Sequence, residues 1–109
     1  MAQIDPHAAV DYLIENAPKY AKAKAERVFL EEYRKSKKSL LMKRHPDLPI
    51  GGQEREAYAH DDYIEVITGL QAAVEEEEKL RWMLIAAQAR IDVWRSQEST
   101  ARAQDRATQ

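Results

Sequence analysis

The sequence contains no cysteine, and it has only three glycines and four prolines among its 109 residues. Without cysteine the chain cannot form a disulfide, a thiolate metal site or a cysteine nucleophile, and this composition fits a reducing compartment. Few residues that break helices, in a chain of which 33% is charged, favour long helices. The sequence therefore predicts an all-α fold in a single helical domain.

Long hydrophobic runs are also missing. The first residues lack the basic start and apolar stretch of a secretory signal, and no segment approaches the roughly 18 to 20 apolar residues that a membrane span needs. We therefore expect a cytoplasmic protein that does not contact a membrane.

Prolines, glycines and acidic caps predict where the helices begin and end. Asp5 before Pro6 is a typical helix start, because the carboxylate can accept hydrogen bonds from free amides of the first turn. Pro18 predicts a break, because proline disfavours helical geometry in the residue before it. The pair Asp61 and Asp62 is a plausible cap for the last helix. The expected order is a short helix at 6–16, a basic helix at 18–44, a loop at 45–52, a short helix at 53–59, a long helix at 62–103 and a frayed tail at 104–109.

Apolar residues recur at spacings of three and four in both long helices, which is the pattern of a buried face. In the basic helix the predicted buried stripe consists of Ala21, Ala25, Val28, Phe29, Tyr33, Ser36 and Leu40. In the long helix the predicted seam consists of Tyr63, Ile67, Leu70, Val74, Glu77, Leu84, Ile91 and Trp94. These spacings predict a helical hairpin or bundle with a long C-terminal helix of coiled-coil type.

A second apolar stripe lies roughly opposite that seam, and consists of Trp82, Ile85, Ala86, Ala89 and Val93. A helix that is apolar on two faces must be central in a bundle, and the other helices of this chain are few. We therefore predict a homo-oligomer with Trp82, Ile85, Ala89 and Val93 in its interface.

Charge is distributed unevenly along the chain. Residues 19–44 carry ten basic and three acidic residues, a net charge of +7, whereas the segments before and after it carry −3 and −6. Six cations fall within eleven residues of this block: Arg34, Lys35, Lys37, Lys38, Lys43 and Arg44. They could neutralise nucleic-acid phosphates, or they could solvate the helix or pair with the acidic half of the chain.

Motifs for catalysis or metal binding are weak. The glutamates at 75–78 point around a helix and cannot converge on one ion, and pairs with Lys79 and Arg81 one turn later explain them better. The three histidines are far apart in the sequence. His60, which precedes two aspartates, is interpreted as a turn and helix cap rather than as part of a catalytic dyad. We expect no enzyme activity, no cofactor, no metal and no small-molecule substrate.

Two segments, LEEYRKSKKSLLM at 30–42 and RWMLIAAQARIDVWRSQE at 81–98, resemble small helical proteins encoded by tailed phages and prophages. The likeness covers most of the chain. Members of that group tend to lie among early genes for replication and recombination, so the resemblance implies an accessory role on DNA or on a DNA-binding protein. It assigns no activity and no functional residue.

Two functions follow as hypotheses. The first is a non-enzymatic accessory protein for DNA recombination or replication, which binds single-stranded DNA or its binding proteins through the basic helix. The alternative is a helical protein–protein adaptor or structural coiled coil with no nucleic-acid contact. The two hypotheses predict different environments for the cations. Binding to DNA requires Lys35, Lys38 and Lys43 to be unpaired on an outward surface, whereas an adaptor should have them paired with acids such as Glu75 and Glu78.

Overall fold

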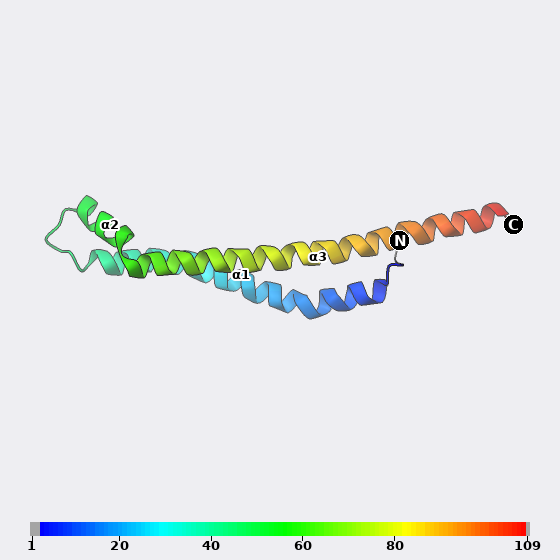
Figure 1. Cartoon of the computed structure of the whole chain (residues 1–109), viewed down its shortest axis with the longest axis horizontal. Coiled ribbons are helices and arrows are strands. Elements are labelled where there is room, and N and C mark those ends of the chain that lie inside the picture. The colour runs from blue at the N-terminus through cyan, green and yellow to red at the C-terminus, as the bar shows by residue number, and fades with distance from the viewer. Residues whose placement is uncertain (1–2, 109) are drawn as a thin grey trace. The chain divides into compact units, whose positions relative to one another are not determined.

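The computed structural model describes residues 3–108, which form helices and turns without a strand. The helices in this part of the chain are α1 (Pro6–Met42), α2 (Ile50–Ala59) and α3 (Asp61–Thr108) (Figure 1). The predicted all-α class is therefore confirmed. The chain divides into two compact units, one of residues 21–78 and the other of the residues up to 20 with those from 79 onward.

Side chains at the helix starts satisfy free backbone amides. The carboxylate of Asp5 accepts hydrogen bonds from the amides of His7, at 2.9 Å, and Ala8, at 3.2 Å, as the sequence predicted. At the start of α3, the amide of Asp62 donates to Nδ1 of His60 at 3.0 Å. His60 is thus the cap, as the sequence indicated for that residue. The prediction that Asp61 and Asp62 supply the cap is wrong, because both lie in the first helical turn.

The break predicted at Pro18 is wrong, because α1 continues through this residue. Proline cannot donate a hydrogen bond to the carbonyl four residues earlier, which belongs to Ile14. Ile14 is 69% exposed, so water can hydrate that carbonyl instead. Two residues earlier, the side-chain amide of Asn16 donates to the carbonyl of Tyr12 at 2.9 Å. One helix therefore replaces the two that were expected at 6–16 and 18–44.

The connection between the first two helices spans residues 43–49 rather than 45–52, and α2 begins at Ile50 rather than at residue 53. The amide of Gln53 donates to the carbonyl of Pro49 at 2.9 Å, and its side chain donates to the carbonyl of Leu48 at 2.9 Å. Gly51 and Gly52 fall in the first turn of α2. Amides of a first turn have no partner within the helix, so glycines there cost less than they would in its interior.

The end of α3 also differs from the prediction. Residues 104–108 are helical rather than frayed, and residue 109 lies outside the described part of the chain. All residues from 95 to 108 are exposed, so tertiary packing does not explain this helix. The segment is rich in alanine, arginine and glutamine, which have high helix propensity, and this composition favours continuation of the helix.

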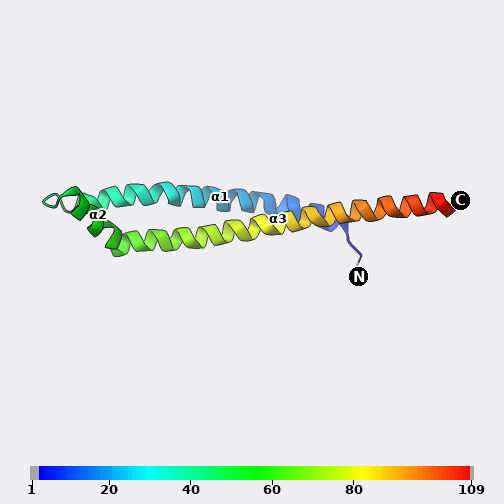
Figure 2. The same cartoon turned by 90° about the horizontal axis from the view of Figure 1, so that it is seen from above.

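In the unit of residues 21–78, α1 and α3 run side by side and α2 lies at their connected end (Figures 1 and 2). Leu41, Ala57 and Tyr63 form a buried cluster there, one residue from each helix, and Met42 packs against it. Inward-facing residues, spaced by three and four, continue from this cluster; we call them the inner seam. They are buried or half-buried, and consist of Ala23, Arg27, Leu30, Arg34, Lys37 and Leu41 on α1 and of Tyr63, Val66, Leu70, Ala73 and Glu77 on α3.

The stripe predicted to be buried on the basic helix is exposed instead. Val28 is 44% exposed, Phe29 62% and Leu40 54%, and the other members of that stripe are exposed too. The face that α1 turns inward is less apolar, but the aliphatic stems of arginine and lysine can cover a core while their charged ends reach polar partners. The apolar stripe of α1 therefore lies outside its own hairpin.

The seam predicted on α3 is largely correct. Tyr63, Leu70, Glu77, Leu84, Ile91 and Trp94 are buried or half-buried. Ile67 and Val74 are 39% and 38% exposed, and so lie at the edge of the seam rather than within it.

The other unit contains the beginning of α1 and the second half of α3. Ala9, Ala87 and Ile91 are its buried apolar residues. A cavity of about 220 Å³ lies between the two segments, and Tyr12 and Met83 are among the residues that line it. Two of the three buried apolar residues in this unit are therefore alanines.

Candidate interaction surfaces

A buried ionic cluster joins α1 to α3 in the unit of residues 21–78. The guanidinium of Arg27 donates through Nε and Nη2 to the two carboxylate oxygens of Glu77, the Nη2 bond being 3.0 Å long. Its Nη1 donates to both oxygens of Glu31 at 3.1 Å. Glu77 is only 6% exposed. Hydrogen bonds with Glu77 and then with Glu31 raise the pKa of Arg27, so the guanidinium stays charged.

The sequence placed Glu77 in the seam of the last helix but did not identify Arg27 as its partner. The two residues are 50 positions apart, and the basic helix offers ten cations. A buried carboxylate requires a cation close to it. The available signal was the spacing of Ala23, Arg27 and Leu30, which places Arg27 on the same face as two apolar residues.

Three of the six predicted nucleic-acid-binding residues form ion pairs with acids of α2 or α3. Lys37 Nζ lies 3.8 Å from Oδ2 of Asp62, and Arg44 Nη2 lies 3.9 Å from the same oxygen. Lys38 Nζ lies 3.4 Å from Oε1 of Glu54. The acids involved are thus Glu54 and Asp62 rather than the expected Glu75 and Glu78.

Lys38 has a second partner in α2. Its ammonium lies 4.6 Å from the centre of the Tyr58 ring, a distance at which a cation is attracted to the face of an aromatic ring. Tyr58 itself packs edge-on against Tyr63, with 5.3 Å between the ring centres. Interaction with Tyr58, and then the nearby Glu54 carboxylate, raises the pKa of Lys38. These contacts hold α2 against α1.

The other three predicted residues lie in different settings. Arg34 is half-buried in the inner seam. Lys35 pairs with Glu32 of its own helix at 3.3 Å, but both side chains are about two-thirds exposed, and such a pair contributes little. Lys43 is exposed in the connection that follows α1. The structure therefore does not bring the six cations together on one outward surface.

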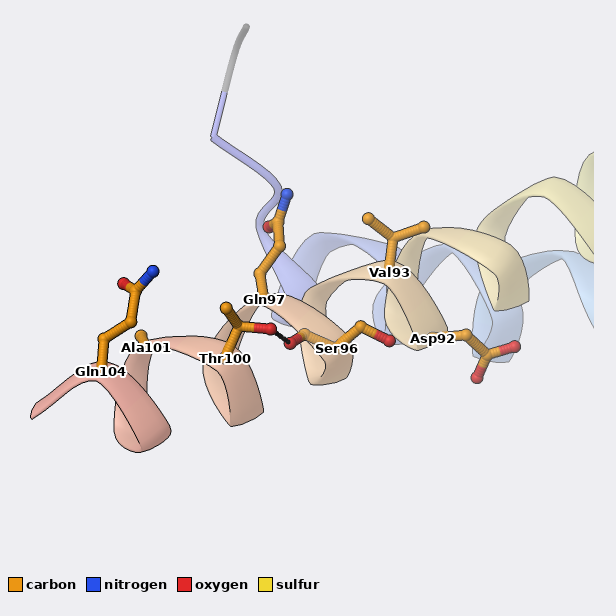
Figure 3. A pocket seen from close by; sticks show the side chains of 7 residues that line it. All are labelled: Asp92, Val93, Ser96, Gln97, Thr100, Ala101 and Gln104. Atoms are coloured by element: carbon orange, nitrogen blue, oxygen red, sulfur yellow. Dashed lines mark hydrogen bonds between the residues drawn. The ribbon is translucent and has the colours of Figure 1, made fainter. Parts of the chain in front are cut away.

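The predicted oligomer interface lies on the outside of α3. Trp82 is 58% exposed, Ile85 43% and Val93 47%, and Ala86 and Ala89 are exposed as well. From Val93 toward the C-terminus, the same face of α3 has a shallow hollow (Figure 3). It is lined by Asp92, Val93, Ser96, Gln97, Thr100, Ala101 and Gln104. Within it, the hydroxyl of Thr100 donates to the carbonyl of Ser96 at 2.9 Å. The described helices leave Trp82, Ile85, Ala89 and Val93 uncovered, whereas Ala86 also lines the cavity that faces the beginning of α1.

A second uncovered apolar surface lies on α1. The rings of Phe29 and Tyr33 are stacked, with their centres 5.7 Å apart and their planes inclined by 14°. They belong to the stripe that the sequence predicted to be buried. An outward aromatic pair next to the exposed Val28 offers a further place where another helix could pack.

No cluster of three histidine or acidic side chains that could hold a metal ion occurs between residues 3 and 108. No helix in that range is long and apolar enough to span a membrane. Near His60, the Nε2 atom lies 3.3 Å from Nη1 of Arg44, while Nδ1 is occupied by the helix cap. The groups around this histidine thus serve the turn between α2 and α3.

Comparison of the chain with family models, with curated proteins and with solved structures finds no match.

Proposed function

We propose that this chain is a non-enzymatic helical adaptor of the cytoplasm, which acts by packing its outer faces against helices of protein partners. The observation that carries the proposal is the contrast between the two candidate surfaces. The apolar residues Trp82, Ile85 and Val93 are 43% to 58% exposed. By contrast, Lys37, Lys38 and Arg44 are bound to acids of the same hairpin.

The exposed apolar surface supports protein docking because of its size and its position. Monomeric proteins rarely expose apolar patches larger than a few hundred Å², and larger ones mark interaction sites. From the exposed fractions of Trp82, Met83, Ile85 and Val93, these four side chains expose roughly 400 Å² together. They lie on a long regular helix, which is a suitable surface for helix packing.

The paired cations support the same proposal. Nucleic-acid binding gains free energy when a cation replaces the counterions of a phosphate. A lysine already bound to a carboxylate and largely covered must first lose that contact, so Lys37 and Lys38, whose side chains are 20% and 25% exposed, are poor candidates for such an exchange. Their role in this proposal is to hold α2 and the start of α3 against α1.

A second candidate function is an accessory role in DNA recombination or replication through binding of single-stranded DNA. Lys35 and Lys43 are exposed, as are Lys22 and Lys24 on the same helix, and these favour that function. The resemblance to phage and prophage proteins favours it as well. It would use the exposed lysines rather than the six residues expected from the sequence.

Fluorescence anisotropy of labelled single-stranded and double-stranded oligonucleotides distinguishes the two functions. The adaptor proposal expects no salt-sensitive binding at low or moderate salt. Binding whose affinity falls with salt, and whose salt slope drops by about 2 in Lys35→Glu/Lys43→Glu, would overturn the adaptor proposal. Arg102→Glu/Arg106→Glu is the matched control, because it makes the same charge change on exposed residues far along the chain.

A further inference from the structure

The outer face of α3 carries a pattern of side-chain sizes that reads almost the same in both chain directions. Residues at spacings of three and four along this face, which we call the outer seam, are Lys79, Trp82, Ala86, Ala89, Val93 and Ser96. The four central residues run large, small, small and large, with spacings of four, three and four. The pattern is therefore symmetric about a point midway between Ala86 and Ala89.

A two-fold interface uses the same patch on both subunits, so the patch must complement itself. Resting on the proposed function, we propose that the partner of this face is a second copy of the chain, packed antiparallel to the first, with the two-fold axis between Ala86 and Ala89. Each Trp82 then packs on Val93 of the partner subunit, and each Ala86 faces Ala89 of the partner subunit. The alanines allow a close approach of the two helices, as small residues do in tightly packed helix pairs.

Charges at the edges of the outer seam disfavour one alternative register. Ile85 and Asp92 flank the seam on one side, and Met83 and Arg90 on the other. In the proposed register Ile85 faces the partner's Asp92, and Met83 faces the aliphatic stem of the partner's Arg90. A shift of seven residues would instead bring Arg90 against the partner's Arg90 and Asp92 against the partner's Asp92, and like charges repel.

The hollow beyond Val93 supplies room for the partner's tryptophan. Ser96 and Gln97 line it next to Val93, and in Figure 3 the Val93 and Gln97 side chains rise from neighbouring turns of α3. In knobs-into-holes packing a side chain enters the space among several residues of the facing helix. The Trp82 ring would sit over Val93 of the partner subunit and extend toward its Ser96.

The area available is close to what a stable dimer needs. Two copies bring together roughly 800 Å² of exposed apolar surface from their large side chains, before the alanines and the stems of charged residues are added. Stable interfaces bury about 1,200 to 2,000 Å² in total. The parallel arrangement is less suitable, because it opposes Trp82 to the partner's Trp82 and leaves the alanine layers underfilled.

Sedimentation equilibrium measures the association directly. We expect a dimer that Val93→Ala weakens, whereas Val10→Ala leaves it unchanged. Val10 is the matched control for Val93, since the two valines are 42% and 47% exposed and undergo the same change. Trp82→Val should weaken the dimer by about thirtyfold or more, as expected for a central interface tryptophan. Circular dichroism must show the same helix content in each variant.

Disulfide trapping tests the orientation, because the natural sequence has no cysteine. In the antiparallel pair, Ala86→Cys and Ala89→Cys face each other only when the two variants are mixed. Each variant alone places its cysteines three residues out of register, which adds about 4.5 Å along the helix axis to their lateral separation and so disfavours a disulfide. A disulfide in the mixture that exceeds either separate reaction supports the proposal. Equal or stronger disulfides in the separate reactions would overturn the antiparallel arrangement.

A wild-type chain that remains monomeric at all concentrations would overturn self-pairing altogether. That result would leave the adaptor proposal standing with a different protein partner. The adaptor proposal fails instead if the oligonucleotide titration shows salt-dependent binding whose salt slope drops in Lys35→Glu/Lys43→Glu, so the two failures are distinguishable.

Discussion

Removal of either partner of the Arg27–Glu77 pair should destabilise the protein to different extents. The side chain of Glu77 is 8% exposed, whereas that of Arg27 is 24% exposed and also binds Glu31. In Glu77→Leu, the guanidinium keeps Glu31 and some contact with water. In Arg27→Leu, the buried carboxylate loses the two guanidinium hydrogen bonds that it accepts. We therefore expect Arg27→Leu to be the more damaging substitution.

The size of the effect follows from the burial of Glu77. Loss of one partner from a buried ion pair costs about 3 to 5 kcal/mol, and a carboxylate that retains slight exposure belongs near 3 kcal/mol. For a chain of this size, that loss lowers the melting temperature by about 15 °C. The double variant Arg27→Leu/Glu77→Leu replaces the ion pair with two apolar side chains and should recover most of the lost stability.

Thermal and urea denaturation followed by circular dichroism at 222 nm would measure these differences, and the four proteins form a double-mutant cycle. Glu31→Gln is a useful control, because it removes the more exposed of the two carboxylates. Equal losses in the two leucine variants would refute the argument from unequal burial. A double variant as unstable as the sum of both single variants would refute the argument that the cost arises from an unmatched buried charge.

Four further substitutions test individual features of the hairpin. Gly69→Ala should raise stability by about 1 kcal/mol, because an added Cβ meets no atom within 4 Å and alanine favours a helix interior; a lower melting temperature would show that another backbone packs there. Leu41→Ala should cost about 3 kcal/mol in urea denaturation, since the side chain is 1% exposed in its cluster; a loss below 1 kcal/mol would mean that the cluster collapses around the gap. His60→Asn should preserve the start of α3 and His60→Ala should lose about 1 kcal/mol, because asparagine can cap and alanine cannot; equal stability of the two would exclude capping. Because its pKa is raised in the folded state, the contribution of Lys38 should be complete below its ordinary value of 10.5 and decline as pH rises through the folded-state pKa; a melting-temperature difference from Lys38→Met that grows with pH in this range would contradict this.

Local signals predicted the helices well. Asp5 and His60 cap helices through short hydrogen bonds to nearby amides, and such contacts depend only on residues close in sequence. The seam of α3 was also visible, because Tyr63, Leu70 and Glu77 recur every seven residues. The break at Pro18 was mispredicted because the cost of one lost hydrogen bond is small beside the packing along a long helix.

The arrangement of the hairpin was less predictable. Periodicity identifies the apolar face of α1 but does not reveal which face meets α3. The stripe that contains Val28 and Phe29 is the more apolar one, yet the face with Arg27 and Leu41 packs inward. The pairing of Lys38 with Glu54 likewise depends on where α2 folds back, which the composition of the connecting segment does not specify. Long-range partners were therefore the part of the candidate site that the sequence left undetermined.

The cluster of Leu41, Ala57 and Tyr63 lies where the chain reverses, and this position has a consequence for the order of folding. Its members are separated by at most 22 positions, from Leu41 to Tyr63, whereas Arg27 and Glu77 are 50 residues apart. Short loops close at a lower entropic cost than long ones. We therefore expect the turn to form first and the two helices to zip together from it, so that the Arg27–Glu77 pair forms late and slows unfolding more than it accelerates folding.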